Sequence, residues 1–462
     1  MRDGPGVGGG VRGSWIARGL AAAVALVLLT SGCYTSEIRP RKVLLSSDDG
    51  LAGGAEISPS ATAASISGLT TGPSAGARGR VSAKSGAGDS SRQRGVSAST
   101  IKLGYVGDFA GQARAFYTPS FDSINAYISD LNSRGGIHGR KVELVYYSAG
   151  YQSDDQTLSA VRRLVEEDGI FGFIELEAMA WSTSAQAFLN EKGVPCIACR
   201  SPNQTNLELG PYNFMVQIDP QAHGDVIGGF MAKRLGKKYM ALGYCESGFE
   251  TRMAQLTGAA FERHGGRIVD KRSIGECQQT SMEASVAAWY STVPRPDVLT
   301  IFDPVGMAEA AAAARRMGWD VQVTGRSGWF QLVLDIGGTQ TDGLIATTEG
   351  IAPPGFQSAQ MSHFRQVLKA YYPDRKVDKK TIEAWSAMVL FEEAALRVGP
   401  NLTARAFVDA IQGMRDFDDG MGARQSFSPQ RHWSRTATGF YRIHNQSFER
   451  ATVEDYFNPG DF

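Results

Sequence analysis

The 462-residue chain carries no net charge, because 47 Lys and Arg residues balance 47 Asp and Glu residues. Proteins that bind nucleic acid through its phosphates typically carry an excess of basic residues, so this balance argues against nucleic acid as a partner. Histidine is scarce as well: the chain has 6, no two of them within a helical turn of each other, and no HExxH motif. The pair Cys196 and Cys199 has no second pair at zinc-ribbon spacing. We therefore expect no metal site and no cofactor.

Long apolar runs are also missing. Past residue 33, no stretch approaches the roughly 18 apolar residues that indicate a membrane-spanning helix, so we expect a soluble body. The run at 20–29 is too short to span a bilayer, and it follows Arg2, Arg12 and Arg18. A basic segment before a short apolar run is typical of a secretory signal peptide.

The apolar run ends in small residues before a cysteine, Leu29-Thr-Ser-Gly-Cys33. This segment resembles a bacterial lipoprotein signal, which implies cleavage after residue 32 and acylation of Cys33. The alternative is an ordinary signal peptide in which Cys33 has no special role. On the lipoprotein interpretation the protein is anchored at the extracytoplasmic side of the cell membrane and contacts the membrane only through its lipid anchor.

Residues 33–98 are rich in Ser, Gly, Ala and Thr. From residue 44 to residue 100 this part of the chain contains no aromatic residue and no sustained helical or strand period. Such a segment cannot bury enough apolar surface to offset the entropy of ordering it. We predict a disordered tether between the signal peptide and the folded body.

From residue 101 onward, short apolar runs alternate with stretches of helical periodicity. Ile101–Val106 is typical of a buried strand, and Phe121, Ile124, Ile128 and Leu131 recur at the spacing of one helix face. Alternation of this kind builds parallel sheets covered by helices. The fold class is therefore predicted to be α/β, with two doubly wound parallel-sheet lobes.

The expected elements can be given by range. Strands are expected at 101–106, 141–147, 170–174, 194–198, 239–244, 267–274, 297–302, 321–325 and 343–348, and closing strands at 425–428, 439–443 and 447–451. Helices are expected around 121–131, 158–165, 182–192, 221–235, 251–264, 281–291, 305–317, 358–371, 379–398 and 403–413.

Three segments together resemble a known family: IKLGYVGDFAGQ, INAYISDLNSRGGIHGRKVELVYY and ALRVGPNLTARAFVDAIQGMRDFDDGMG. They are similar to the leucine/isoleucine/valine-type substrate-binding proteins of ABC importers, which are type I periplasmic-binding proteins. The resemblance runs from about residue 101 to residue 449. It implies two lobes joined by three crossing strands, a small-molecule ligand held between them, and an ABC permease and ATPase complex as partner. The implied boundaries are 99–218 and 349–430 for lobe 1, and 219–348 and 431–462 for lobe 2 with the C-terminal tail.

The same resemblance implies ligand contacts in the loops that follow the strands. In the first lobe they fall at Phe116, Trp181, Ser182, Asn203 and Thr205, and in the second at Phe249, Asp303, Ser327 and Trp329. Trp181 and Trp329 are equally well explained as residues that pack within a lobe.

One of these positions bears on the ligand. Ser327 stands where the family has the glutamate that binds an amino-acid ammonium group, and a serine cannot balance a buried positive charge. Asp303, Glu246 or Glu177 are the candidate replacements, since each is expected at a strand end. We therefore expect an aromatic, amide or organic-acid ligand rather than a plain branched-chain amino acid.

Four cysteines remain after Cys33, in what we expect to be an oxidising compartment. Cys245 and Cys277 each follow a strand, and a disulfide between them is expected if those strands are neighbours in a parallel sheet. Cys196 and Cys199 are three residues apart in an expected strand, which places them on opposite faces about 10 Å apart. We expect these two to be free thiols.

Two other classes of function compete with solute binding. An enzyme is disfavoured, because Asp335–Thr339 resembles a phosphate loop in the wrong topological context and no catalytic Ser–His–Asp spacing occurs, so no catalytic residue is assigned. A ligand-sensing or partner-binding lipoprotein with the same two-lobed fold and no transport role stays open beside the importer subunit.

Overall fold

The computed structural model describes residues 41–42, 93–109, 114–149, 153–174, 183–199, 209–277, 281–326, 330–353, 355–452 and 456–462, without the side chains of residues 41–42, 115–116, 183 and 330. The expected signal peptide and Cys33 lie outside this part of the chain. Within the expected tether, Arg41–Lys42 forms the short strand β1 and residues 93–98 are described, with a bridge from Val96 to Ile101. These two places are the described parts of the expected tether, and the tether itself stays a prediction.

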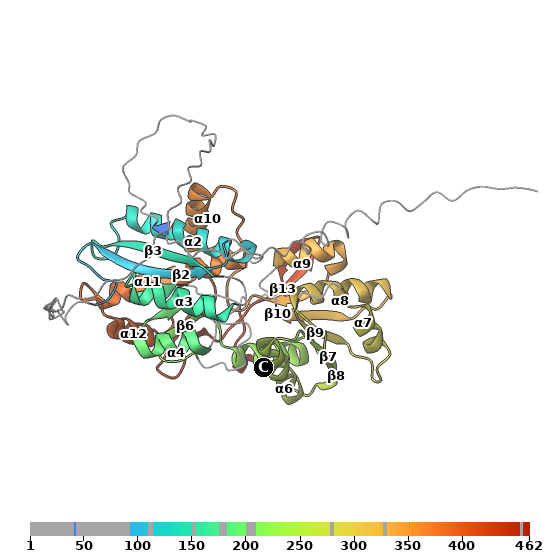
Figure 1. Ribbon diagram of the computed structural model, residues 1–462. Coiled ribbons are helices and arrows are strands. Elements are labelled where there is room, and N and C mark those ends of the chain that lie inside the picture. The colour runs from blue at the N-terminus through green and yellow to red at the C-terminus, as the bar shows by residue number, and fades with distance from the viewer. Residues whose placement is uncertain are drawn as a thin grey trace, which may run out of the picture. The chain divides into compact units, whose positions relative to one another are not determined.

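The first sheet has the order β1-β3-β2-β4-β5-β6-β12. Figure 1 labels its strands β2, β3 and β6. Its strands are β1, β2 (Thr100–Gly107), β3 (Lys141–Ser148), β4 (Gly172–Ile174), β5 (Cys196–Ile197), β6 (Asn213–Ile218) and β12 (Trp433–Arg435). All neighbours are parallel except β1, which runs antiparallel to β3. All six residues of β6 and six of the eight residues of β2 are buried, as expected for strands covered on both faces.

Two groups of helices accompany this sheet. They are α2 (Arg114–Ser133), α10 (Ala359–Tyr371), α11 (Lys379–Val398) and α12 (Ala404–Gln412) in one group, and α3 (Asp154–Glu166) and α4 (Thr183–Lys192) in the other. The helix α11 packs against α2 and α12, and α3 packs against β2, β3 and α4. A glycine turn follows α2: Gly136 has φ 72°, and a Cβ there would lie 2.0 Å from the carbonyl oxygen of Arg140.

The second sheet has the order β14-β13-β11-β10-β9-β7-β8. Its strands are β7 (Tyr239–Tyr244), β8 (Arg267–Ser273), β9 (Val298–Phe302), β10 (Gln322–Arg326), β11 (Ile345–Thr347), β13 (Phe440–His444) and β14 (Ser447–Arg450). The first five are parallel, whereas β13 is antiparallel to both β11 and β14. Both sheets thus have the parallel cores of doubly wound lobes, as predicted.

The remaining helical elements lie in the chain just before β7, between the strands of the second sheet, or after its last strand. They are α5 (Pro220–Gly229), the π-helical turn η1 (Phe230–Arg234), α6 (Gly248–Arg263), α7 (Glu283–Tyr290), α8 (Pro304–Arg316), α9 (Phe330–Gly337), and the 3₁₀ turns η2 (Gly338–Thr341) and η3 (Pro459–Asp461). An apolar cluster between α7, α8 and the central strands forms the core of this lobe. Among the described helices, none has the length and apolar character needed to cross a bilayer.

The chain passes between the sheets at three places: residue 219, residues 348–352 and residues 436–439. Hydrogen bonds tie these crossings together. The Ile218 N–H donates to the Glu349 carbonyl (3.1 Å), and the Asp219 N–H donates to the Arg435 carbonyl (2.8 Å). The Arg435 Nε also donates to the Val216 carbonyl at 2.6 Å.

The last crossing corrects two expectations. Trp433–Arg435 lies in the range assigned to the second lobe, yet it pairs in parallel with β6 of the first sheet. In addition, residues 425–428 form no strand, only isolated bridges from Phe417 to Gln425 and from Ser428 to Arg431. A three-residue strand placed by tertiary pairing leaves no periodic signal in the sequence.

Cys196 and Cys199 form a disulfide with their Cα atoms 5.9 Å apart, so the expectation of two free thiols was wrong. The strand β5 ends at Ile197, and Ala198 adopts φ 62°. This left-handed residue turns the chain, which removes the extended geometry that would have held the two sulfur atoms apart. The structure also joins Cys245 to Cys277, with Cα atoms 4.7 Å apart, across the neighbouring strands β7 and β8.

Candidate functional site

The carboxyl ends of the second sheet's parallel strands deliver several polar residues to one edge. The strand β7 lies between β8 and β9 in the sheet. The chain runs from β7 to β8 on one side and then returns to β9 on the other side, so the strand order changes direction at β7. Ligands of open α/β sheets bind outside the carboxyl ends of the strands at such a point. Arg326 is the last residue of β10, and Glu349 follows β11.

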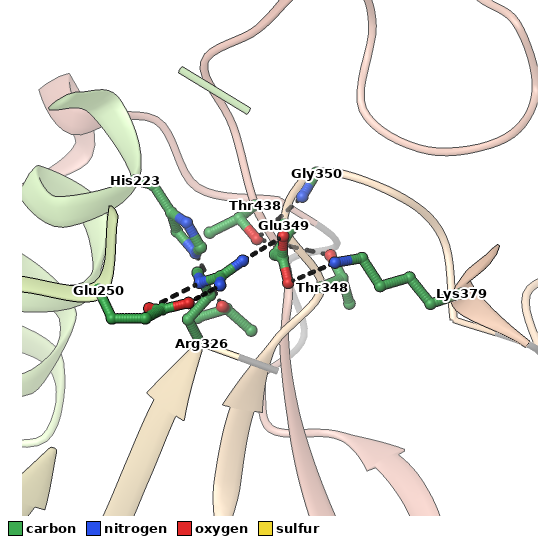
Figure 2. Close-up of polar contacts among 9 residues, drawn as sticks. His223, Glu250, Arg326, Thr348, Glu349, Gly350, Lys379 and Thr438 are labelled. Atoms are coloured by element: carbon green, nitrogen blue, oxygen red, sulfur yellow. Dashed lines mark hydrogen bonds and ion pairs between the residues drawn. The ribbon is translucent and has the colours of Figure 1, made fainter. Parts of the chain in front are cut away.

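Arg326 lies between two carboxylates (Figure 2). Its Nη1 donates to Glu349 Oε2 at 2.8 Å, and its Nε and Nη2 donate to the two oxygens of Glu250, the first at 3.4 Å. Glu250 is in the first turn of α6. The guanidinium carbon lies 4.8 Å from the ring centroid of Phe249, a cation–π distance. The Arg326 side chain is only 13% exposed.

Glu349 connects this arrangement to the first lobe. Its Oε1 accepts a hydrogen bond from the Lys379 Nζ at 2.8 Å, and both side chains are 4% exposed. Lys379 is the first residue of α11, after the N-cap Asp378. We call Glu250, Arg326, Glu349 and Lys379 the charged cluster. It runs from the second lobe, through the crossing at 348–352, to a helix of the first lobe.

The backbone at Glu349 is unusual. This residue has φ 57°, a left-handed conformation that side chains other than Gly, Asn and Asp rarely adopt, and Gly350 follows with φ 81°. Such a conformation persists only where the surroundings hold it. Two side-chain ion pairs and the hydrogen bond from Ile218 to the Glu349 carbonyl do so here.

Electrostatics keeps Glu349 and Arg326 ionised. Burial alone raises the pKa of Glu349, but the charges of Arg326 and Lys379 outweigh it and hold the pKa well below its usual range. Burial alone lowers the pKa of Arg326, yet Glu250 and Glu349 outweigh that effect and raise its pKa. Both shifts favour the charged forms of Arg326 and Glu349.

His223 lies beside the cluster on α5. Its Nε2 is 2.8 Å from Thr347 Oγ1. Complete burial lowers its pKa to about 3, an effect that the charge of Glu349 only partly opposes. The ring is therefore neutral at physiological pH and adds no further charge.

Of the ligand-contacting residues expected from the sequence, the structure describes the side chains of two, Phe249 and Asp303. Phe249 is buried at the start of α6 and lies under the Arg326 guanidinium. Asp303 is the N-cap of α8, and its Oδ2 accepts from the Gly306 N–H at 2.7 Å. Contact of either residue with a ligand stays a prediction.

The other expected contacts fall outside the described side chains: Phe116, Trp181, Ser182, Asn203, Thr205, Ser327 and Trp329. Of the carboxylates considered for an ammonium group, Glu177 is also outside. Glu246 is exposed and accepts from Ser273 Oγ at 3.0 Å. Within the described part of the chain, no group of three or more His, Cys, Asp or Glu residues could hold a metal ion.

Sequence reasoning did not identify Arg326, Glu349 and Lys379. A local signal existed for each of them. Arg326 and Glu349 are charged residues directly at the ends of buried parallel strands, where ligands usually bind. Lys379 and Lys380 open a helix with positive charge at the positive end of its dipole, an unfavourable arrangement that indicates a nearby anion. Which carboxylate pairs with which cation depends on the crossings between the sheets.

Comparison with known families and structures gives a consistent result. Residues 100–445 match the family described as periplasmic binding protein. Among solved structures, a leucine-binding protein from Thermotoga maritima shares 18% identity over 78% of this chain and 100% of its own, with a TM-score of 0.62. No curated protein matches the chain.

Two further solved structures contain bound molecules. A branched-chain amino acid transporter substrate-binding protein from Streptococcus pneumoniae, in complex with isoleucine, shares 19% identity over 78% of this chain and 100% of its own, with a TM-score of 0.63. A solute-binding protein of an ABC transporter from R. palustris, in complex with 4-hydroxybenzoate, shares 16% identity over 78% of this chain and 97% of its own, with a TM-score of 0.64. At these identities the likeness establishes a shared fold.

Proposed function

Because the chain belongs to the periplasmic binding protein family, we propose that it is an extracytoplasmic solute-binding lipoprotein that captures a small molecule between its two lobes and delivers it to an ABC importer. The family resemblance expected from the sequence is confirmed, and so is the type I periplasmic-binding fold. The family and the similar structures are solute-binding proteins, and the proposed role is binding without covalent chemistry.

The observation that carries the proposal is the placement of the charged cluster. Glu349 sits on a crossing segment and bonds Arg326 of the second lobe and Lys379 of the first, each at 2.8 Å. Residues at the ligand-binding edge of one sheet are therefore coupled to the other lobe through a crossing. Hinge closure requires a ligand that stabilises one lobe arrangement over another, and the charged cluster lies where the two lobes join.

The proposed ligand is an amino-acid-like, amide, aromatic or organic-acid molecule. Proteins of this fold hold isoleucine in one case and 4-hydroxybenzoate in another, so the fold alone does not choose between these classes. The choice depends on the residues at the strand ends, foremost Phe249 and Arg326 among those described.

Binding is tested by measuring the melting temperature of the purified protein with aliphatic and aromatic amino acids, their amides and small organic acids. A ligand at a hundredfold its dissociation constant adds about 2.7 kcal/mol to the stability of the folded state. We expect at least one compound to raise the melting temperature.

Uptake of that compound by cells with and without the gene distinguishes an importer subunit from a sensor. Deletion of an importer subunit lowers uptake of the compound, whereas deletion of a sensor leaves uptake unchanged.

The lipid anchor is tested separately. We expect the wild-type chain in the membrane fraction of the producing bacterium and a Cys33→Ala variant in the soluble extracytoplasmic fraction, because only an acylated cysteine supplies the hydrophobic anchor. Mass spectrometry of the mature N-terminus should find acylated Cys33. An unmodified N-terminus at any other residue would support the ordinary signal peptide instead.

A further inference from the structure

In the charged cluster, each carboxylate oxygen accepts a hydrogen bond from a cation, whereas the guanidinium keeps donors that no described residue uses. Both oxygens of Glu250 accept from Arg326, and the two oxygens of Glu349 accept from Arg326 and Lys379 respectively. A guanidinium has five N–H donors. Within the described part of the chain Arg326 uses three of them, which leaves one N–H on Nη1 and one on Nη2.

The position of Arg326 lets these donors serve a ligand. The side chain stands at the carboxyl end of β10, where this sheet type binds its ligands, and it retains 13% exposure. Phe249 supports the guanidinium from one face, and the carboxylates of Glu250 and Glu349 fix its orientation. A guanidinium held in this way is preorganised to bond an incoming oxygen acceptor.

A ligand ammonium group would meet the opposite situation. It would come close to two cations, Arg326 and Lys379, and every carboxylate oxygen of the cluster already accepts from one of them. Taking an ammonium group out of water without a carboxylate partner is strongly unfavourable. His223 is neutral and does not alter the balance.

We propose that Arg326 determines the specificity of the site, which takes carboxylic acids without an amino group, their carboxylate bonding the two remaining N–H donors of Arg326. This inference rests on the proposed solute-binding function and narrows its ligand class. It assigns to Arg326 a direct contact with the solute.

Two matched series of probes test the proposal. One consists of 4-methylpentanoate, leucine and 3-methylbutylamine, and the other of 3-phenylpropanoate, phenylalanine and 2-phenylethylamine. Within each series the carbon skeleton stays constant while the amino or carboxyl group is removed. Dissociation constants of the purified protein are measured by calorimetry. We expect the acid to bind at least about tenfold more tightly than its amino acid, a difference of about 1.4 kcal/mol, and the amine to bind least.

The outcomes distinguish a failure of the specificity assigned to Arg326 from a failure of the proposed solute-binding function. If an amino acid or amine binds more tightly than its matched acid, the proposed function stands and the specificity assigned to Arg326 is wrong. If no probe of either series binds, the proposed function fails for these solutes and the inference fails with it.

Variants then test the residue itself. Arg326→Met releases Glu250 and should reverse the preference, so that the amino acid binds more tightly than the acid. The double variant Arg326→Met with Glu250→Gln removes one charge of each sign and leaves Glu349 paired with Lys379, so it should fold even if the single variant does not. Its preference for the acid should fall at least about tenfold. An unchanged ratio of acid to amino-acid affinity in this folded double variant would overturn the proposal.

Arg272 offers a matched control. It lies on β8 of the same sheet, its guanidinium carbon is 5.4 Å from the Trp289 ring centroid, and it pairs with Asp270 at 2.5 Å. Arg272→Met therefore removes an arginine of the same kind, stacked on an aromatic ring and paired with an acid, outside the charged cluster. We expect it to leave the ratio of acid to amino-acid affinity unchanged.

Discussion

Replacing Asp419 by Asn removes the negative partner of a fully buried ion pair at the junction between the lobes. Asp419 Oδ2 accepts from Arg435 Nη2 at 2.5 Å, and both side chains are 0% exposed. The same oxygen accepts from Ser386 and, at 2.7 Å, from Gln425. Arg435 in turn holds the Val216 carbonyl at 2.6 Å. The ion pair therefore joins the start of the third crossing to β6 and α11.

The expected loss of unfolding free energy follows from the burial of this ion pair. Asn keeps the shape but leaves the Arg435 guanidinium without a compensating charge in a site that water does not reach. Breaking a buried pair by removing one charge costs about 3–5 kcal/mol. With a urea m-value of about 3 kcal/mol/M, the unfolding midpoint should fall by about 1–1.7 M. This is a large part of the about 5–15 kcal/mol that stabilises a typical protein.

Asp416 supplies the matched control, since it lies three residues earlier in the same loop and pairs with Arg424 at 3.0 Å, with the two side chains 74% and 56% exposed. Exposed pairs contribute about 0–1 kcal/mol, so Asp416→Asn should shift the midpoint by less than about 0.3 M. Urea unfolding followed by circular dichroism measures both variants. Equal midpoints for Asp419→Asn and Asp416→Asn would refute the reasoning from burial.

Two further predictions concern pH and the disulfide. The folded protein holds the pKa of His223 at about 3, through its burial, whereas an unfolded histidine titrates near about 6.5. Between these values the unfolded state binds the extra proton, so stability is fully present above about pH 6.5 and falls by up to about 1.4 kcal/mol per unit as pH decreases. Melting temperatures at pH 7 and pH 5 should therefore differ more for the wild type than for His223→Gln, and parallel curves would contradict the assignment. Cys277→Ser opens a disulfide that links residues 32 apart, and we expect it to lower the unfolding free energy by about 2–4 kcal/mol in urea titrations without reductant; an unchanged midpoint would show that this bond contributes little.

Local sequence patterns were enough to predict the alternating strands and helices. The helix expected at 379–398 has those bounds in the structure, and the strands expected at 239–244 and 297–302 match β7 and β9 to within a residue. Such elements are readable because apolar periodicity and capping residues act over a few neighbouring positions. The alternation of strands and helices then limits the chain to parallel sheets.

Predictions from local sequence failed where a single backbone conformation or the pairing of one short strand determines the structure. Ala198 turns the chain with a positive φ and thereby brings Cys196 and Cys199 together. The strand β12 has only three residues, and it is held beside β6 by backbone pairing and by the Arg435 side chain rather than by any periodic pattern. Neither feature can be read from composition or spacing.

Sequence patterns were sufficient to predict the two α/β lobes, the family resemblance, and the strand ends at which ligands are expected. The pairing of Arg326 with Glu250 and Glu349, and of Glu349 with Lys379, became visible in the folded molecule alone. Strands and helices form through interactions between near neighbours. A buried charge instead finds its partner through the sheet order and the crossings, which in the charged cluster pair residues up to 76 positions apart.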